Sequence, residues 1–456
     1  MIAERSPLNI ADKIKPGVRF KPAKREVLSF QVGGKDLQYD ANAMTLTTGQ
    51  KAGPAEPSSC FRPDFSHPGV RDHAGYLVLC LTRACNLRCE YCFARDLKQG
   101  QATRMTSDTA RRALELLLPP QGPVTVAFFG GEPLLEWDLL TETVEFAKHV
   151  YRGPGRPGFH LTTNGTLLDP AKVTFLDHEG FDLIVSLDGP KEMHNRSRPA
   201  GQGTDSYEAT LNGLRLLKGQ RLATRTTLRG TFMACDMRLR ERLEHHHGLL
   251  DEGVAAHVSL EPVSLTESAC RGVGPGHESS FDDSATDWAK VEQEYGRAAE
   301  FLRDRIRQRR AASFEQLVRF VRRLAFRQAA CCECEAGNGY ASVAPDGTIY
   351  ACHREGASVI GNLAAGGLDE CLRAKWLDGR FYHSPRCVEC PIRLVCGGPC
   401  RQDAVERGDM HAPAEAGCKL RHIWFRWAAW LLSELPREEA ARLTGQKPTT
   451  CCGQRT

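Results

Sequence analysis

The chain has 456 residues, which is too long for one ordinary core and predicts two or three domains. Its 60 Lys and Arg residues nearly balance its 56 Asp and Glu residues, and the net charge of +4 gives no strong field for nucleic acid or acidic lipid. No segment approaches the roughly 18 continuous apolar residues of a membrane span, and the N-terminus has no apolar core of signal-peptide length. We therefore expect a soluble, cytoplasmic protein that binds neither nucleic acid nor membrane.

The first part of the chain, residues 1–74, is poor in long apolar periods. Apolar and polar residues alternate from 27 to 48 around Gly33 and Gly34, which predicts a β-hairpin. The Gly- and Pro-containing stretch 49–59 is typical of a linker. We interpret residues 1–74 as a hairpin region that serves as a reduced peptide-recognition element, to which a peptide could add as a strand.

Residues 75–265 alternate short apolar runs with helical patterns. Continuous apolar strands joined by helical crossovers predict an α/β fold with a parallel sheet, here a partial (β/α)6 TIM barrel. In such folds the chemistry lies at the carboxyl ends of the strands, where this sequence places its polar, Gly-rich segments. The expected strands are 76–82, 124–131, 159–165, 182–189, 225–233 and 257–263, and the expected helices include 107–118, 139–150, 207–219 and 237–246.

The last third of the chain divides into three parts. Residues 266–330 form a bridging region that is helical and Arg-rich after a loop. Residues 331–420 contain ten cysteines among short strands and loops, and we expect a cysteine-rich α+β domain there. Residues 421–456 hold an amphipathic helix and a tail; the spacing of Trp424, Trp427 and Trp430 indicates a packed helical stripe.

Nineteen cysteines in a cytoplasmic protein are better explained by metal or cluster ligation than by disulfides. Cys85, Cys89 and Cys92 follow the first expected strand, and no fourth Cys or His lies nearby in that loop. A structural zinc site requires four ligands, whereas three thiolates hold a [4Fe–4S] cluster with one iron open. The C-x3-C-x2-C spacing, with Tyr91 before the last Cys, resembles the radical S-adenosylmethionine (SAM) superfamily.

The resemblance continues in the segments that follow the next strands. It implies that the GGEP segment contacts SAM, with the Glu132 side chain at the SAM amino group, and that Asn164 belongs to the same site. It also implies that Ser186 and Arg198 contact the ribose and the carboxylate of SAM. Asn195 stands where the family often has Asp. By themselves, Asp188 and Gly189 in the segment SLDG indicate only a β-turn, and Arg198 only a surface ion pair. The implied cofactor-binding residues are Tyr91, Gly130, Gly131, Glu132, Pro133, Asn164, Ser186 and Arg198.

The cysteine spacing of residues 331–420 resembles the SPASM domain, which carries two auxiliary [4Fe–4S] clusters. The resemblance assigns Cys387, Cys390, Cys396 and Cys418 to the distal cluster, and Cys334, Cys352 and Cys400 to the proximal one. Its fourth ligand is Cys331 or Cys332, or the position is open to substrate. The alternative is a pair of zinc knuckles, because C-x2-C pairs alone would fit them.

A radical SAM enzyme of this type is expected to modify a peptide. The chain resembles maturases of ribosomally made peptides that form Cys thioethers, which implies a Cys-containing precursor peptide and an electron donor such as flavodoxin or ferredoxin. Glu261, at the end of the last expected strand, contacts substrate or is a structural carboxylate. The alternatives are an anaerobic sulfatase-maturating enzyme that forms formylglycine and, outside enzymes, an iron–sulfur electron-transfer or scaffold protein.

The remaining cysteines and a histidine run are expected to have no role in the chemistry. His245, His246 and His247 are interpreted as an exposed helix end. Cys80 is expected to pack inside a strand, and Cys60, Cys235, Cys270 and Cys371 are expected to be buried or incidental thiols. Cys451 and Cys452 lie in a polar tail.

Overall fold

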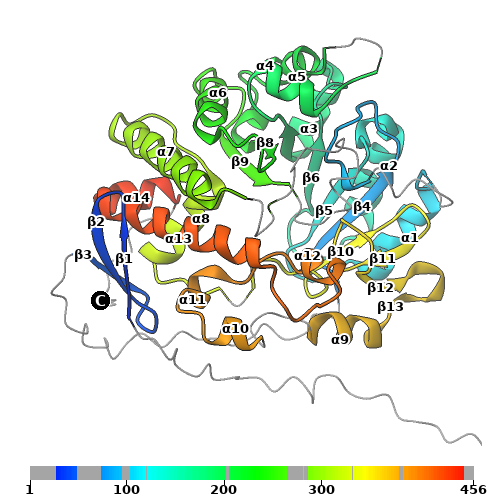
Figure 1. Cartoon of the computed structure of the whole chain (residues 1–456). Helices are drawn as coiled ribbons and strands as arrows, with labels where there is room; N and C mark the ends of the chain where they lie inside the picture. The colour runs from blue at the N-terminus through cyan, green and yellow to red at the C-terminus, as the bar shows by residue number, and fades with distance from the viewer. Residues whose placement is uncertain are drawn as a thin grey trace, which may run out of the picture.

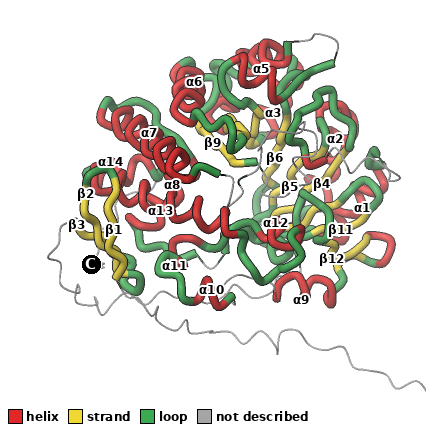
Figure 2. Tube along the Cα trace, in the orientation of Figure 1, coloured by secondary structure: helices red, strands yellow, loops and turns green. Residues whose placement is uncertain are grey.

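The computed structural model describes nine stretches of the chain: residues 27–48, 73–94, 103–119, 121–201, 205–263, 281, 286–330, 332–378 and 384–445. Figures 1 and 2 show helices arranged around a central curved sheet, with a small separate sheet at the N-terminal end. No helix in these stretches is long and apolar enough to cross a membrane.

The expected α/β partial barrel is confirmed. Six strands lie side by side in chain order, and all of them are parallel. β4, β5 and β9 contain continuous runs of buried residues, as their apolar sequences predict, whereas buried and partly exposed residues alternate along β6, β7 and β8. The strands are β4 (Tyr76–Thr82), β5 (Thr125–Gly130), β6 (Gly158–Thr163), β7 (Asp182–Ser186), β8 (Thr226–Phe232) and β9 (His257–Pro262).

The crossover helices begin and end at local signals in the sequence. Thr106 caps the first of them, because its side chain accepts a hydrogen bond from the Thr109 N–H. Asp169 caps the third, which has Pro170 in its first turn and ends at Gly180 in the left-handed region with φ 72°. The helices are α1 (Ser107–Leu117), α2 (Trp137–Val150), α3 (Pro170–Glu179), α4 (Lys191–Ser197), α5 (Ser206–Arg215) and α6 (Leu239–Asp251).

The cysteine-rich region continues the barrel sheet instead of forming a separate one. β10 (Tyr340–Val343) pairs in parallel with β4, and three antiparallel strands extend the sheet beyond it. These are β11 (Thr348–Tyr350), β12 (Val359–Asn362) and β13 (Gly367–Leu368). Four short helices follow: α9 (Glu370–Asp378), α10 (Pro385–Val388), α11 (Arg393–Cys396) and α12 (Arg401–Glu406). This pairing brings the C-terminal cysteines beside the loop that follows β4.

The expected N-terminal hairpin is present. β1 (Val27–Val32) and β2 (Lys35–Asp40) pair antiparallel, and β3 (Thr45–Thr48) adds to β2. The two-residue turn needs positive φ at both positions, which Gly33 (52°) and Gly34 (73°) provide. The hairpin packs on the C-terminal helix α13 (Glu415–Glu434), where the rings of Tyr39 and Phe425 lie 4.9 Å apart. The linker expected at 49–59 lies outside the described residues.

The bridging region forms two helices that pack with α13. They are α7 (Trp288–Arg307) and α8 (Glu315–Ala325), and α14 (Arg437–Leu443) follows α13 at its far end. Trp424, Trp427 and Trp430 are buried, which confirms the packed stripe. In Figure 1, α13 runs between these helices and the cysteine-rich segment. It therefore joins the N-terminal sheet, the bridging helices and the cysteine-rich region.

The prediction of an exposed histidine run was wrong. α6 continues to Asp251, and His246 and His247 are fully buried on its inner face. The Nδ1 atoms of His246 and His247 lie 2.6 and 2.7 Å from the carbonyl oxygens of Arg242 and Leu243, and the Ser313 N–H donates to His247 Nε2 at 3.0 Å. Histidines with such hydrogen-bond partners can be buried in a core. The run of three histidines in the sequence does not show that these partners exist.

Candidate active site

A cavity of about 950 Å³ opens at the carboxyl ends of the parallel strands. One wall comes from the loops that follow the strands of the barrel, and the opposite wall comes from the cysteine-rich region and α13. Residues from the barrel side include Arg83, Cys85, Cys89, Tyr91, Cys92, Gly130, Gly131, Thr163, Asn164, Ser186, Arg198, Arg229, Thr231 and Glu261. Residues from the opposite side include Cys334, Tyr340, Cys352, His353, Arg354, Cys400, Asp403 and Trp424.

The three cysteines after β4 all line this cavity. Their loop is fixed to the end of α4 by two backbone hydrogen bonds, from Arg88 N to Pro199 O (2.8 Å) and from Glu90 N to Ser197 O (3.0 Å). Two donors reach the sulfur atoms: the Leu87 N–H lies 3.4 Å from Cys85 Sγ, and Arg198 Nη1 lies 3.9 Å from Cys89 Sγ. Such donors stabilise thiolates that hold an iron–sulfur cluster.

The GGEP segment follows β5 and lies against the backbone of the cysteine loop. The Gly131 N–H donates to Thr82 O (2.7 Å), and the Glu132 N–H donates to Ala84 O (2.8 Å). A Cβ atom at Gly130 would collide with the Thr82 carbonyl, and one at Gly131 would collide with the Ala84 carbonyl. Glycine is therefore required at both positions because two backbones touch there.

We expect Gly131→Ala to destabilise the protein by roughly 1–3 kcal/mol, because the added methyl group must push the segment before Cys85 aside. Urea unfolding followed by circular dichroism measures the change. Gly248→Ala is the matched control, since Gly248 is exposed in α6 and has open space around it. That control should be neutral or stabilising by about 1 kcal/mol. Equal effects of the two substitutions would contradict the assigned close approach.

Glu132 was expected to reach the amino group of SAM, and the structure gives it several protein partners. Its side chain is fully buried and is not among the residues that line the cavity. Oε1 accepts from the Leu134 N–H (3.0 Å) and from Thr163 Oγ1 (2.7 Å), and Oε2 accepts from the Asn164 N–H (2.8 Å). Burial raises its pKa, and these hydrogen bonds oppose the rise. Glu132 thus ties the ends of β5 and β6 together, with Pro133 in the first turn of a short 3-10 helix (Pro133–Glu136).

Two of the expected SAM-contacting residues line the cavity at the next strand ends. Asn164 follows β6, and its Nδ2 atom donates to Asn86 Oδ1 (2.8 Å) and lies 4.0 Å from Cys85 Sγ. Ser186 ends β7 and also lines the cavity. Both residues line the cavity that the three cysteines also line, and their contacts with SAM remain predictions.

Arg198 lines the cavity but is paired with a residue that the sequence did not single out. Its Nε atom lies 3.1 Å from Oδ1 of Asp188, whose side chain is fully buried, and its guanidinium stands 5.4 Å from the centre of the Tyr91 ring. The Tyr91 hydroxyl donates to Asp188 Oδ2 (2.5 Å), and the Thr231 N–H donates to Asp188 Oδ1 (2.9 Å). Burial by itself would raise the Asp188 pKa, and the charges of Arg198 and His194 outweigh it and hold the pKa below its ordinary value.

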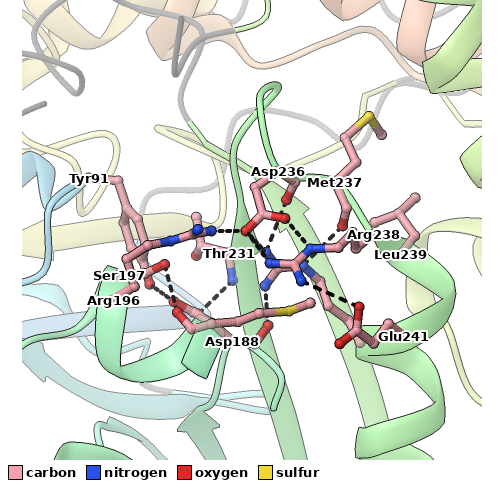
Figure 3. A network of polar contacts seen from close by, with 12 residues as sticks. Tyr91, Asp188, Arg196, Ser197, Thr231, Asp236, Met237, Arg238, Leu239 and Glu241 are labelled. Atoms are coloured by element: carbon pink, nitrogen blue, oxygen red, sulfur yellow. Dashed lines mark hydrogen bonds and ion pairs between the residues drawn. The ribbon is translucent and has the colours of Figure 1, made fainter. Parts of the chain in front are cut away.

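Figure 3 shows that this network continues from Asp188 to a second carboxylate, Asp236. Arg242 is the link, because it donates to the Asp188 carbonyl and, through Nη2, to the Asp236 carbonyl at 3.0 Å. Asp236 also pairs with Arg196 at the end of α4 and with Arg238. The sequence "SLDG" indicated only a turn at Asp188, and no local signal reveals that it is the buried centre of this network.

Glu261 lies where the sequence placed it, at the end of β9 and on the cavity wall. Its Oε1 atom is 3.4 Å from Arg229 Nη2 and 3.2 Å from Ser259 Oγ. Its side chain is 30% exposed and that of Arg229 is 42% exposed, so this pair remains accessible to a ligand in the cavity.

Cys334, Cys352 and Cys400 line the same cavity from the opposite side. Arg354 joins two of these positions: its N–H lies 3.5 Å from Cys352 Sγ and its Nη1 atom 3.6 Å from Cys400 Sγ. Arg354 is held in turn by Asp403 (2.6 Å) and Glu406 (3.1 Å). Cys332 donates instead to Glu335 (3.5 Å) and does not line the cavity, and Cys331 lies outside the described residues.

The other four cysteines assigned to an auxiliary cluster share a second cavity. Cys387, Cys390, Cys396 and Cys418 line a space of about 470 Å³ between the short helices and α13. His422 Nε2 lies 3.7 Å from Cys390 Sγ. Several cationic side chains line the same space, among them Arg386, Arg393, Lys419 and Arg426.

The chemistry of these thiols fits iron–sulfur clusters. Burial raises the pKa of Cys89, Cys352 and Cys387 to about 12, and that of Cys390 and Cys418 to about 11. Bound iron would replace the protons and supply the positive charge that such thiolates need. In the described stretches, no three His, Cys, Asp or Glu side chains form a group that could hold a single metal ion, and one zinc ion requires ligands at about 2.3 Å. Cysteines distributed around a cavity suit a multi-iron cluster better.

The remaining cysteines are placed as follows. Cys80 is buried in β4, as expected. Cys235 and Cys371 are exposed. Cys60, Cys270, Cys451 and Cys452 lie outside the described residues.

Comparison with known proteins matches the barrel to a family model. The family model of the radical SAM superfamily matches residues 79–233. A cysteine-type anaerobic sulfatase-maturating enzyme of Clostridium perfringens is 32% identical over 149 residues, which is 31% of this chain and 40% of that protein. The chain matches half or less of the length of the first two curated relatives found.

Solved structures share the fold over a larger part of the chain. Native anSMEcpe with bound AdoMet superimposes with a TM-score of 0.62 at 19% identity, covering 78% of this chain and 98% of that one. The same protein is also known with AdoMet and the Cp18Cys peptide. Streptococcus suis SuiB bound to precursor peptide SuiA gives a TM-score of 0.52 at 14% identity, covering 76% of each chain. Residues 79–233 thus match a family that implies a [4Fe–4S] cluster and SAM, and the chain shares its fold, including the cysteine-rich region, with anSMEcpe.

Proposed function

We propose that the chain is a radical SAM peptide maturase that links a peptide cysteine to a carbon atom of another residue as a thioether. One observation carries this proposal: two sets of three cysteines, one from each side, line a single cavity of about 950 Å³. A substrate held there would touch the place where a radical forms and the place where a thiol can be bound. Anaerobic sulfatase-maturating enzymes and SuiB share the fold, and both are known with peptides bound.

Each set of residues has a role in this proposal. Cys85, Cys89 and Cys92 would hold the SAM-binding cluster, with Asn164, Ser186 and Arg198 around the bound SAM. Cys334, Cys352 and Cys400 would hold the proximal auxiliary cluster, and the four cysteines of the second cavity the distal one. With SAM and an electron from a donor such as flavodoxin or ferredoxin, this cofactor set supplies a 5′-deoxyadenosyl radical and an electron acceptor.

The proposed reaction balances with SAM as the oxidant. One hydrogen atom leaves a C–H bond of the peptide and ends in 5′-deoxyadenosine, and one proton leaves the cysteine thiol. One C–S bond would form as one electron passes to the auxiliary cluster, which balances the electron that the donor gave when SAM was converted to methionine and 5′-deoxyadenosine. The peptide therefore loses two hydrogens per link, and SAM is consumed rather than regenerated.

The chain's own side chains would orient the peptide and exclude water. Leu87, Phe93, Phe129 and Val263 give the cavity apolar walls. Glu261, near the end of β9, and Arg229, within β8, form an accessible charged pair on the cavity wall, and we assign them to the peptide. Cys332 points to Glu335 and not into the cavity, which argues against it as the fourth ligand of the proximal cluster. We propose that this position is open to the substrate thiol, and Cys331, which lies outside the described residues, is the alternative ligand.

A second candidate is an anaerobic sulfatase-maturating enzyme, which the Clostridium perfringens relative favours. Formylglycine formation from cysteine removes the sulfur from the peptide, whereas a thioether keeps it. The non-enzymatic alternative, an iron–sulfur carrier, does not explain why segments that resemble a SAM site follow four successive strands around one cavity.

Cys400→Ala tests the proposal. We expect the variant to stop cross-linking while it still forms some 5′-deoxyadenosine, because its SAM-site cysteines are intact. Reconstituted enzyme, a Cys-containing peptide encoded beside the gene, SAM and dithionite are incubated without oxygen, and peptide mass and 5′-deoxyadenosine are measured. Cys371→Ala is the matched control, because Cys371 is exposed and lines neither cavity.

Three results would contradict the thioether reaction. One is a wild-type product whose cysteines all remain alkylatable. Another is a product that has lost sulfur and carries an aldehyde, which would establish the sulfatase-type reaction. The third is no 5′-deoxyadenosine from fully reconstituted wild-type enzyme, which would support a carrier.

A further inference from the structure

A buried ion pair joins the two walls of the large cavity. Arg83 lies between β4 and Cys85, and Glu355 lies three residues after Cys352. Arg83 Nη2 and Glu355 Oε2 are 2.7 Å apart, and the two side chains are only 1% and 3% exposed. Water is therefore largely excluded from the pair, and neither charge has solvent as a substitute partner.

Glu355, which carries the carboxylate of this pair, has an unusual backbone conformation. Glu355 has φ 58°, in the left-handed region that favours glycine, and Gly356 follows it at φ 65°. The turn is closed by a hydrogen bond from Glu355 N to Cys352 O at 3.0 Å. A residue with a side chain in this conformation costs free energy, which the buried ion pair of the carboxylate would offset.

The turn is also tied to the third cysteine of the proximal set. Gln402 Nε2 donates to the Glu355 carbonyl at 3.1 Å, and Gln402 lies in α12, which begins immediately after Cys400. Arg83 therefore contacts, through one carboxylate, a turn that bears on both Cys352 and Cys400. On its own side, the Arg83 N–H donates to Thr103 O (2.7 Å), which fixes the backbone two residues before Cys85.

We propose that Arg83 and Glu355 are a positioning pair that sets the separation of the two cysteine sets across the cavity. This rests on the proposed function, in which radical formation on one side must be coupled to capture of the thiol on the other. The pair joins the loops by a charge-assisted contact between guanidinium and carboxylate, so changes at either end alter the spacing between the sites. Neither residue would take part in the chemistry itself.

Glu355→Gln tests this role with two measurements. In the purified enzyme, we expect amide hydrogen exchange to rise roughly tenfold in both loops, residues 83–92 and 351–358, because the contact that links them is weakened. In the reconstituted enzyme, we expect cross-linked product per 5′-deoxyadenosine to fall by roughly tenfold to a hundredfold, because small misplacements uncouple a reaction. Formation of 5′-deoxyadenosine should stay within about threefold of wild type.

The controls separate positioning from general stability. Asp251→Asn breaks a partly buried ion pair of α6 with Arg305 (2.6 Å) that bears on neither cysteine set, and it should change neither measurement. Arg83→Lys keeps the charge but loses the planar guanidinium, and it should give an intermediate ratio of cross-linked product to 5′-deoxyadenosine. If Glu355→Gln does not fold, both measurements are made on Arg83→Lys instead. Exchange that rises only in residues 351–358, with an unchanged product ratio, would overturn the proposal. If wild-type enzyme forms no 5′-deoxyadenosine, the proposed function fails, and the exchange at residues 83–92 still decides whether the pair joins the loops.

Discussion

Replacing Cys89 with Ala is expected to abolish SAM cleavage. Cys89 is the middle cysteine of the loop after β4, its sulfur accepts from Arg198, and it lines the large cavity with Cys85 and Cys92. A cluster held by three thiolates cannot be kept by two, and SAM then has no iron to bind. Iron per chain should fall from about twelve to about eight, because the auxiliary cysteines are untouched. The measurements are iron analysis after anaerobic reconstitution and 5′-deoxyadenosine formed with SAM and dithionite.

Cys235→Ala is the control for this experiment. Cys235 is an exposed thiol that does not line the large cavity, so its loss should change neither iron content nor SAM cleavage. Normal 5′-deoxyadenosine formation by Cys89→Ala, or near-stoichiometric zinc with little iron in the wild-type protein, would refute the assignment of this loop.

Arg198→Ala is expected to lower both stability and SAM binding. The substitution leaves the fully buried Asp188 carboxylate without its cation, and an uncompensated buried charge typically costs about 3–5 kcal/mol. It also removes the donor near Cys89 Sγ. The loop that carries the three cysteines should therefore be less well ordered, and SAM binding should weaken with it. Urea unfolding and a SAM-binding titration measure the two effects.

An exposed ion pair at the other end of β7 from Asp188 provides the control for Arg198→Ala. Asp182, at the start of β7, lies 2.9 Å from Arg225, and these side chains are 60% and 41% exposed. Arg225→Ala should therefore change stability by less than about 1 kcal/mol. If Arg198→Ala keeps full stability, or if Arg225→Ala loses as much stability, the buried Arg198–Asp188 pair does not make the predicted contribution to the free energy of unfolding.

The pH dependence of Arg198→Ala follows from the lowered pKa of Asp188 in the folded protein. Burial alone would raise that pKa, and the charges of Arg198 and His194 bring it below the ordinary value. A lowered folded-state pKa means that the stability from this carboxylate is present above the unfolded pKa of about 3.9 and is lost as the pH falls through the folded one. Without Arg198 the pKa rises, so the destabilisation by Arg198→Ala should shrink as the pH is lowered from 7 toward 4.

Glu132 and Asp188 show where inference from the sequence stopped. Both follow strands that were expected at those places, and both were assigned from a motif or a turn signal. In the structure Glu132 joins β5 to β6, and Asp188 gathers Tyr91, Arg198 and Arg242. A carboxylate in a motif can contact a ligand or the protein, and only the groups packed around it decide which.

The sequence by itself determined most of the secondary-structure elements of the barrel and of the N-terminal hairpin. The strand from Tyr76 to Thr82 has the expected bounds, and the other barrel strands lie within the expected runs except β6, which begins one residue earlier, because apolar sequences between helical periods leave few alternatives. The glycines of the N-terminal turn likewise predicted the hairpin, since only positive φ closes a two-residue loop of this kind. The resemblance to the SPASM domain placed Cys387, Cys390, Cys396 and Cys418 in one group, and these four cysteines line one cavity.

The tertiary structure decided how these parts meet. Pairing of β10 with β4 is a contact between residues about 260 positions apart, and nothing in the local period of either strand specifies it. That pairing places the second cysteine set opposite the first and creates the buried environment in which Arg83 meets Glu355. Burial is also what turned a run of histidines into core residues and a turn aspartate into the centre of a charge network. The free energy of a charged or polar group depends on what lies across from it, and that partner is fixed only when the chain is folded.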